Sequence, residues 1–264
     1  MELELTDKVA VVTGASKGIG LAVTRALAEH GARVVAGSRT VTDDLARLAD
    51  KYDITPHQVD LATRRGPAEL IQRAADTYGR LDVLVNNVAT SSPAPSFTDV
   101  DDDTWQRIFD STFFSAVRAS RAAVPHLLAG GGTIVNISSG NARVPAPMIV
   151  HYSAAKAALS NLTQALSEEL APQGVRVNTV SPGPVRTPLW TAPDDGFATM
   201  MAAGSGTTVE DIMDRVLPET MSIATGRISE PEEVADLVVF LASGRAANIT
   251  GSDFVIDGGL IKSV

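Results

Sequence analysis

The chain alternates short β-branched runs with segments of helical periodicity from residue 8 to residue 256. The first run, 8–13, is apolar and ends at a glycine, which is typical of a strand buried on both faces of a parallel sheet. Residues 18–29 then place apolar side chains at helical spacing, and a second apolar run covers 32–36. This alternation predicts βαβ units, in which helices cover both faces of a parallel sheet.

The rest of the chain repeats this alternation, so we expect seven strands in one α/β, doubly wound sheet. A length of 264 residues fits a single domain of this class, spanning 1–264. Further strands are expected at 54–59, 81–85, 133–137, 175–180 and 254–256, and further helices at 42–50, 64–78, 102–127, 152–170 and 231–242.

One stretch interrupts the alternation. Between Pro182 and Gly226 the chain is rich in Pro, Gly, Thr and Met, with a short helical pattern only near 208–217. A long irregular segment inside a domain is usually a lid or a binding loop. We therefore predict a lid or substrate loop at about 185–226, and a mobile surface insertion is the alternative.

Composition excludes several kinds of site. The chain has no cysteine, and its four histidines include no pair at metal-ligand spacing, so no metal site is predicted. Its net charge of −9 disfavours nucleic acid and anionic membranes as partners. No run approaches the roughly 18 apolar residues of a membrane-spanning helix. The amino terminus lacks the basic region of a signal peptide, so a cytoplasmic location is expected.

Three glycines, Gly14, Gly18 and Gly20, lie between the first expected strand and the first expected helix. Glycines there permit a tight turn and a close approach of the backbone to a pyrophosphate, while the helix N-terminus offers free N–H groups. The position between strand and helix makes this signal stronger than three glycines alone. The Gly-x-x-x-Gly-x-Gly spacing differs from the usual Gly-x-Gly-x-x-Gly of dinucleotide sites.

Charge at the end of the second expected strand bears on which dinucleotide binds. Gly37, Ser38 and Arg39 follow one another there, with no acidic side chain to accept a ribose 2′-hydroxyl. Lys17 and Arg39 offer two cations for a 2′-phosphate, and Ser38 offers a hydroxyl. This arrangement favours NADP(H) over NAD(H), which remains possible. The alternative is that both cations are solvated surface charges.

A tyrosine and a lysine, Tyr152 and Lys156, have the i,i+4 spacing that places both on one helix face. A free phenol titrates near 10, and a nearby ammonium lowers that pKa. Such a phenol can exchange a proton with a carbonyl or alcohol oxygen while a hydride moves at carbon. Ser139 follows the strand expected at 133–137, where its hydroxyl can bond the same oxygen.

Together these residues resemble the short-chain dehydrogenase/reductase family along essentially the whole chain, from Lys8 to Gly259. The family has a Rossmann-type sheet, so the resemblance implies one dinucleotide-binding oxidoreductase domain. Further motifs that carry the resemblance are Asp60, Asn86-Asn87-Val88-Ala89, Asn136-Ile-Ser-Ser139, Pro182-Gly183 with Thr187, and Asp257-Gly258-Gly259.

The resemblance implies a role for individual residues. Asp60 with Leu61 would hold the adenine, Asn87 would lie along the adenosine, and Lys156 would bridge the ribose hydroxyls. The family's spacing selects Ser139 rather than Ser138 as the catalytic serine. The residues expected to contact the cofactor are Gly14, Ser16, Lys17, Gly18, Ile19, Gly20, Ser38, Arg39, Asp60, Leu61, Asn87, Val88, Ala89, Tyr152, Lys156, Pro182, Gly183, Val185 and Thr187.

Two positions depart from the family pattern. The family usually has an asparagine seven residues after the tryptophan of the fourth helix, where it holds a water of the proton relay. Counting from Trp105 gives Thr112, which we expect to act in the site in its place. Val88-Ala89 replaces the usual Ala-Gly and adds methyl groups near the cofactor. His151 precedes the tyrosine, but one residue rotates about 100° along a helix, so we expect it at the rim or in packing.

The sequence thus predicts an NADP(H)-dependent oxidoreductase that interconverts a ketone and a secondary alcohol. One alternative is a 3-oxoacyl-thioester reductase, although the charge of −9 disfavours docking of an acidic carrier protein. Another is a cofactor-binding sensor that has lost turnover. The family resemblance implies a homotetramer, or a homodimer, with the helix after Ser139 packed against its mate. The alanines at 154, 155, 157 and 158 suit such a contact, and equally suit packing on the chain's own sheet.

Overall fold

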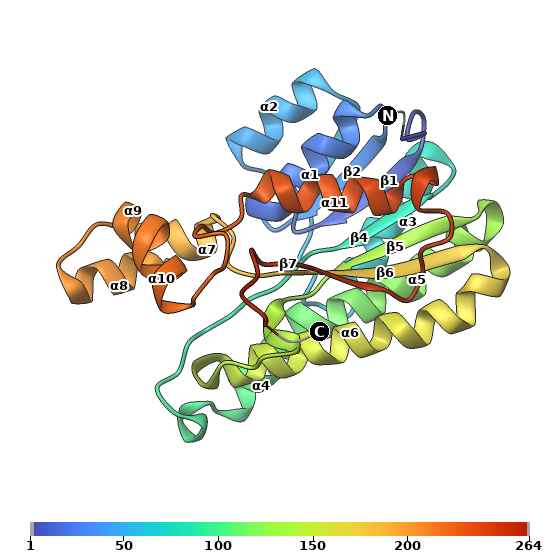
Figure 1. Ribbon diagram of the computed structural model, residues 1–264. Helices are drawn as coiled ribbons and strands as arrows, with labels where there is room; N and C mark the ends of the chain where they lie inside the picture. Colours follow the sequence, from blue (N-terminus) through green and yellow to red (C-terminus); the bar gives the residue numbers. More distant parts are fainter. Residues whose placement is uncertain (1–2, 263–264) are drawn as a thin grey trace.

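The computed structural model describes residues 3–262, and its centre is a seven-stranded parallel sheet (Figure 1). The strand order is β3-β2-β1-β4-β5-β6-β7. Every neighbouring pair is parallel, as the alternation of strands and helices predicts. The strands are β1 (Val9–Thr13), β2 (Arg33–Ser38), β3 (Ile54–Gln58), β4 (Val83–Asn86), β5 (Gly132–Ile137), β6 (Val175–Pro182) and β7 (Asp253–Ile256).

Helices cover both faces of the sheet (Figure 1). One face carries α1 (Gly18–Glu29), α2 (Asp43–Lys51) and α11 (Pro231–Ala242). The other carries α3 (Gly66–Tyr78), α5 (Ser115–Gly130) and α6 (Val150–Leu170). None of the helices within residues 3–262 is both long and apolar enough to cross a membrane.

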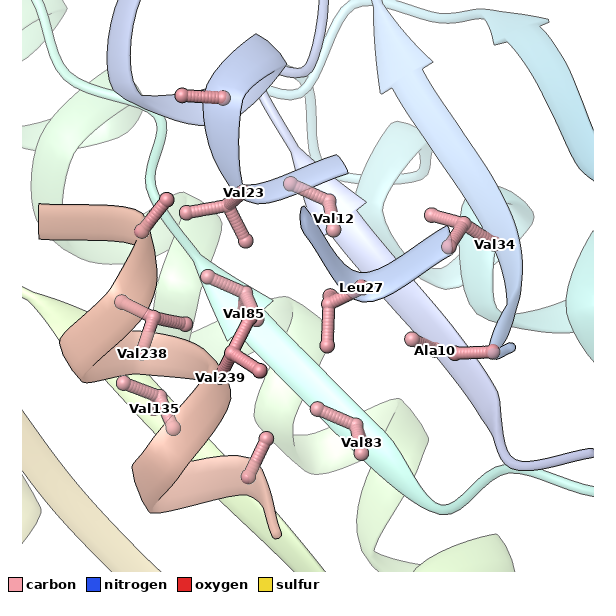
Figure 2. Close-up of a cluster of buried hydrophobic side chains, with 14 of the residues drawn as sticks. Ala10, Val12, Val23, Leu27, Val34, Val83, Val85, Val135, Val238 and Val239 are labelled. Atoms are coloured by element: carbon pink, nitrogen blue, oxygen red, sulfur yellow. The ribbon is translucent and has the colours of Figure 1, made fainter. Parts of the chain in front are cut away.

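Strand β1 illustrates why the sheet is buried on both faces. Its five residues are all buried, and successive side chains of a strand point to opposite faces. Ala10 and Val12 join the core beneath α1 and α11, whereas Val9 and Val11 join the core beneath α3 and α5. Figure 2 shows the first of these cores, in which side chains of α1 and α11 meet those of the central strands. The apolar run at 8–13 is therefore read correctly as a doubly covered strand.

The order of the strands determines where a ligand can bind. Strand β1 lies between β2 and β4, so the chain crosses the sheet in one direction after β1 and in the other after β3. At such a reversal the connections diverge and leave a crevice outside the carboxyl ends of the strands.

The helix expected at 102–127 is not continuous. Helix α4 (Asp102–Phe109) is followed by a π-helical segment, η2 (Asp110–Phe114), before α5 begins. The Ser111 hydroxyl donates to the carbonyl oxygens of Arg107 and Ile108, and the Ser115 hydroxyl donates to that of Ser111. Such bonds from serine to the preceding turn bend helices, and single π-turns are frequent at functional sites.

The segment that interrupts the alternation is more regular than the sequence suggests. It contains α7 (Pro188–Thr191), α8 (Phe197–Ser205), α9 (Val209–Asp211), a π-helical turn and α10 (Leu217–Thr220). These elements form a group beside the carboxyl edge of the sheet, drawn in orange in Figure 1. They share a small apolar core of their own, lined by Ala198, Ala202, Ile212, Met213, Leu217, Ile223 and Ile228.

A buried carboxylate joins β1 to β4 at the opposite edge of the sheet. Asp82 is 4% exposed and accepts hydrogen bonds from the Val9 N–H at 2.9 Å and from the Arg80 guanidinium at 2.5 and 2.8 Å. Burial alone raises the pKa of Asp82, but the bonds from Arg80 and Val9 and the Lys8 charge outweigh it and hold that pKa below its usual value.

We expect Asp82→Asn to lower the free energy of unfolding by about 2 kcal/mol at pH 7, because it removes a charge-assisted bond and leaves Arg80 without its partner. A carboxyl whose pKa is depressed by folding contributes stability above its unfolded pKa, near 3.9, and loses it as the pH falls through the folded pKa. Urea unfolding of the wild type and of Asp82→Asn from pH 7 to pH 3 should show the difference between their free energies of unfolding shrinking below about pH 4. A difference in unfolding free energy that does not change with pH would contradict this prediction. So would an equal loss of stability in the control Asp76→Asn, at an exposed position.

Candidate functional site

A cavity of about 540 Å³ opens at the carboxyl ends of the strands, where the strand order reverses. Every residue that the sequence analysis expected to contact a cofactor lines this cavity. Of the four expected catalytic residues, Ser139, Tyr152 and Lys156 line it and Thr112 does not. Residues far apart in the sequence, from the turn after β1 to the segment after β6, thus meet in one crevice.

The glycine turn after β1 is shaped to accept a ligand closely. Gly14 and Gly18 have φ of +67° and +56°, the left-handed region that favours glycine. A Cβ at Gly20 would lie 2.1 Å from the Gly14 carbonyl oxygen, so no larger residue fits there. The N-cap residue of α1, Lys17, makes no side-chain capping bond. The first N–H groups of α1 are thus left for an anion, as a pyrophosphate requires.

Asn87 holds this turn against β4. Its side-chain amide donates to the carbonyl oxygens of Thr13 at 2.9 Å and Gly14 at 3.2 Å. In return, the Thr13 hydroxyl accepts from the N–H groups of Asn87 and Val88, and it donates to the Val85 carbonyl oxygen. The amide of Asn87 is therefore occupied by the protein, although the residue also lines the cavity.

Two cations stand at one end of the cavity. Lys17 and Arg39 are exposed, line the cavity and make no ion pair within residues 3–262. Ser38 lies beside them, and its hydroxyl donates to the Thr40 carbonyl oxygen at 2.9 Å, which leaves the oxygen free to accept a bond. This end of the cavity therefore suits a negatively charged group.

The phenol of Tyr152 and the hydroxyl of Ser139 come together at the other end. Burial raises the pKa of Tyr152, and the hydrogen bond with Ser139 lowers it, with burial the larger effect. Ser139 also accepts from the Asn141 N–H at 3.1 Å. The neighbouring Ser138 is used differently, because its hydroxyl bonds the Lys156 carbonyl oxygen and the Ser160 hydroxyl in α6.

Lys156 is 1% exposed, and its ammonium lies 5.7 Å from the centre of the Tyr152 ring. Its Nζ donates to the Ile137 carbonyl oxygen at 2.5 Å. Burial lowers the pKa of Lys156 to about 7. The expectation that this lysine lowers the tyrosine pKa is not met, because in the protein alone the pKa of Tyr152 is raised. The physical reason is desolvation, which disfavours the charged forms of both side chains.

The η2 residue that lines the cavity is Ser111, not Thr112. Thr112 is fully buried, and its hydroxyl accepts from the Thr90 N–H at 3.3 Å and lies 3.5 Å from the Thr90 carbonyl oxygen. Ser111 bonds the Thr90 hydroxyl at 2.5 Å. Both η2 residues thus hydrogen-bond Thr90, which itself lines the cavity. Their orientation depends on the π-turn, which the sequence did not indicate.

His151 lies in packing, as expected for a residue one step along the helix from Tyr152. It is fully buried, and its ring meets that of Trp105 edge-on at 5.9 Å. Burial lowers the pKa of His151, so its neutral form is favoured. It does not line the cavity.

Sequence reasoning missed part of the cavity wall. Most of the missed residues are next in the sequence to a predicted site residue, and that proximity is the signal that could have identified them. Trp190 and Leu189 are different, because they belong to the irregular segment after β6. The residues added by the structure are Thr40, Thr42, Val59, Ala62, Thr90, Ser111, Ile137, Ser138, Pro188, Leu189 and Trp190.

Comparison with known proteins places the chain in a large group of oxidoreductases. A family model described as enoyl-(acyl carrier protein) reductase matches residues 14–261. The cis-4-hydroxycyclohexanecarboxylate dehydrogenase of Sinomonas cyclohexanicum is 37% identical over 96% of each chain. The 3-oxoacyl-(acyl-carrier-protein) reductase of Thermotoga maritima is 31% identical over 98% of this chain and all of the relative.

Among solved structures, the L-sorbose reductase of Gluconobacter frateurii, complexed with NADPH and L-sorbose, superposes with a TM-score of 0.93. It is 32% identical, and the match covers the whole of both chains. The seven-stranded parallel sheet of this chain agrees with these matches in fold. The chain belongs to the short-chain dehydrogenase/reductase family of oxidoreductases.

Proposed function

We propose that this protein is an NADP(H)-dependent oxidoreductase that interconverts a ketone and a secondary alcohol. The observation that carries the proposal is that Ser139, Tyr152 and Lys156 line the same cavity as the glycine turn. The turn, with its uncapped α1 N-terminus, fits a pyrophosphate. The NADPH of the sorbose reductase complex supports a nicotinamide cofactor for this chain as well.

The roles of the three side chains follow from their bonds. Bound NADPH supplies the hydride. Ser139 and Tyr152 share the oxygen of the substrate carbonyl, and Tyr152 donates its proton to that oxygen as the carbon is reduced. In the reverse direction Tyr152 accepts the proton of the alcohol. Lys156, held by the Ile137 carbonyl oxygen, has further N–H donors to bind the ribose hydroxyls.

We propose Thr112 as a positioning residue for Thr90. Its hydroxyl contacts only the backbone of Thr90 among the hydrogen bonds of residues 3–262, and it has no surface on the cavity. Ser111 and Thr90 both line the cavity, and their hydroxyls bond each other at 2.5 Å. The role foreseen for Thr112 is therefore divided among three hydroxyl-bearing residues.

A 3-oxoacyl thioester is the second candidate substrate, and one observation favours it. Leu189 lines the cavity, and its apolar side chain is 45% exposed. An acyl chain could lie on such a side chain. The Thermotoga relative acts in this class, but the cyclohexane and sorbose enzymes are equally similar in fold or sequence. The simple ketone therefore remains the proposal.

We propose a homotetramer or homodimer as the assembly. Helix α6 supports this in part, because Ala157 is exposed while Ala155 is buried within the chain. The alanines are therefore divided between packing on the sheet and a face available to a second copy. A cytoplasmic location stays a prediction.

Tyr152→Phe should reduce turnover by at least about 10²–10⁴-fold, because it removes the general acid and leaves the ring. Cofactor affinity and the thermal midpoint should be retained. Steady-state absorbance at a saturating ketone concentration measures turnover, and quenching of Trp190, which lines the cavity, reports binding.

The comparison variant is Thr112→Val, which keeps the volume and removes the hydroxyl that holds Thr90. It should lose much less turnover than Tyr152→Phe and keep cofactor affinity. Near-wild-type turnover in Tyr152→Phe would refute the mechanism. Cofactor binding by the wild type without turnover on any of a panel of ketones would favour a sensor instead.

Cofactor preference depends on Arg39 and Lys17, the cations at the far end of the cavity. Arg39→Asp should lower the NADPH to NADH affinity ratio by roughly ten- to 150-fold, the equivalent of one charge-assisted hydrogen bond. Titration with each dinucleotide, followed by protein fluorescence, measures the ratio. Arg73→Asp, on the exposed side of α3, has the same change of charge and should leave the ratio unaltered. An unchanged ratio in Arg39→Asp would remove the argument for NADP(H).

We propose that residues 185–226 act as a lid. They pack around their own small core, and Leu189 and Trp190 line the cavity. Backbone amides of 188–220 should exchange with deuterium quickly in the protein alone and more slowly with cofactor and substrate together, since closure restricts opening. Helix α11 serves as the internal reference. Slow exchange in both states would contradict a lid.

A further inference from the structure

We propose that Arg118 positions the adenine end of the cofactor site by clamping the loop after β3 to the helix that borders the active site. This inference rests on the proposed cofactor site. Arg118 lies in α5, outside the cavity, and reaches two separate elements with one guanidinium. No motif of the sequence analysis includes it.

The loop after β3 is the first element. Asp60, Leu61 and Ala62 line the cavity. The Asp60 carboxylate accepts from the Ala62 N–H at 3.0 Å, and the Thr63 hydroxyl donates to the Asp60 carbonyl oxygen at 2.8 Å. A Cβ at Gly66 would lie 2.0 Å from that same oxygen, so the loop turns back tightly on itself. These bonds shape the loop but do not attach it to the rest of the protein.

Leu61 packs into the core beneath α3 and α5, and Arg118 supplies the polar attachment of the loop. Its Nη1 donates to the Ala62 carbonyl oxygen at 2.9 Å and approaches that of Thr63 at 3.4 Å. A guanidinium is planar and always charged, so it can hold carbonyl oxygens and a carboxylate at once in a fixed geometry. The Arg118 side chain is only 17% exposed, which limits competition from water.

The second element is η2. The Nη2 of Arg118 donates to Asp110 Oδ1 at 2.6 Å, and the Gln106 amide donates to the other oxygen at 2.7 Å. Burial raises the pKa of Asp110, but the bonds from Gln106 and Arg118 outweigh it and hold that pKa below its usual value. The guanidinium also lies 5.3 Å from the centre of the Phe114 ring. Asp110 directly precedes Ser111, which lines the cavity.

The clamp therefore fixes one wall of the adenine pocket relative to the helix beside the catalytic residues. Arg118 bonds none of the proposed catalytic residues and does not itself line the cavity, so its loss should affect binding of the adenine end and not the chemical step. Without Arg118, part of the binding free energy of the ligand would be used to order the loop, and the affinity would fall.

The test is Arg118→Met, which keeps the length of the side chain and removes its donors. Its affinity for adenosine 2′,5′-bisphosphate and for NADPH should fall by a similar factor, about tenfold, in calorimetric titrations. The kcat at saturating NADPH should change less than twofold, while the KM for NADPH rises. Hydrogen exchange of residues 61–64 should become faster. Arg118→Lys keeps the positive charge but loses the planar set of N–H donors of the guanidinium. Its affinity should therefore lie between those of Arg118→Met and the wild type.

Arg121→Met is the matched control, because Arg121 lies one turn further along α5 and is exposed, with no ion pair within residues 3–262. It should bind both ligands as the wild type does. If Arg118→Met does not fold, Asp110→Ala decides, since it removes the acceptor of the guanidinium on η2 and should weaken binding of the bisphosphate. Unchanged affinity in either variant, or a fall in kcat with unchanged affinity, overturns the clamp. Failure of the wild type to bind either ligand would instead refute the proposed cofactor site.

Discussion

The hydrogen bonds between Thr13 and Asn87 hold together the two strands at which the sheet reverses its order. The Asn87 amide is bonded to the carbonyl oxygens of Thr13 and Gly14, and the Thr13 hydroxyl accepts two backbone N–H groups in return. These bonds hold the turn after β1 against the end of β4. The uncapped helix N-terminus and the glycine turn then face a cavity, and the rest of the site is arranged around that opening.

A buried lysine sets the chemistry at the other end of the opening. Removing an ammonium from water is costly, and the pKa of Lys156, lowered by burial to about 7, reflects that cost. The Ile137 carbonyl oxygen at the end of β5 offsets part of it. In the proposed reaction, the ribose hydroxyls would supply the remaining acceptors. The lysine therefore links the binding of a ligand to the arrangement of Tyr152, whose own pKa burial raises.

The sequence predicted the structure correctly where a residue pattern depends on local conditions, such as burial of a strand or limited space at a turn. Continuous apolar runs marked strands such as β1 because both faces of the sheet are covered. Glycines at 14, 18 and 20 marked the turn because a larger side chain would crowd Asn87 at positions 14 and 20 and Thr187 at position 18. The helix at 102–127 was predicted as continuous because its periodicity hides the back-bonding of Ser111 and Ser115. The segment after β6 was underestimated because its short helices depend on a core that they build together.

The sequence by itself determined the α/β class and the seven strands, because these depend on spacing within one element or at its end. Together with the family resemblance it also gave most of the residues that line the cavity. Only the tertiary structure decided which residue of η2 lines the cavity, how burial shifts the pKa values of Tyr152 and Lys156, and which arginine ties the loop after β3 to α5. Each of these depends on burial and on contacts between residues far apart in the chain. The bond from the Arg118 guanidinium to Ala62 is not indicated by any periodicity in the sequence, because packing alone brings the two residues together.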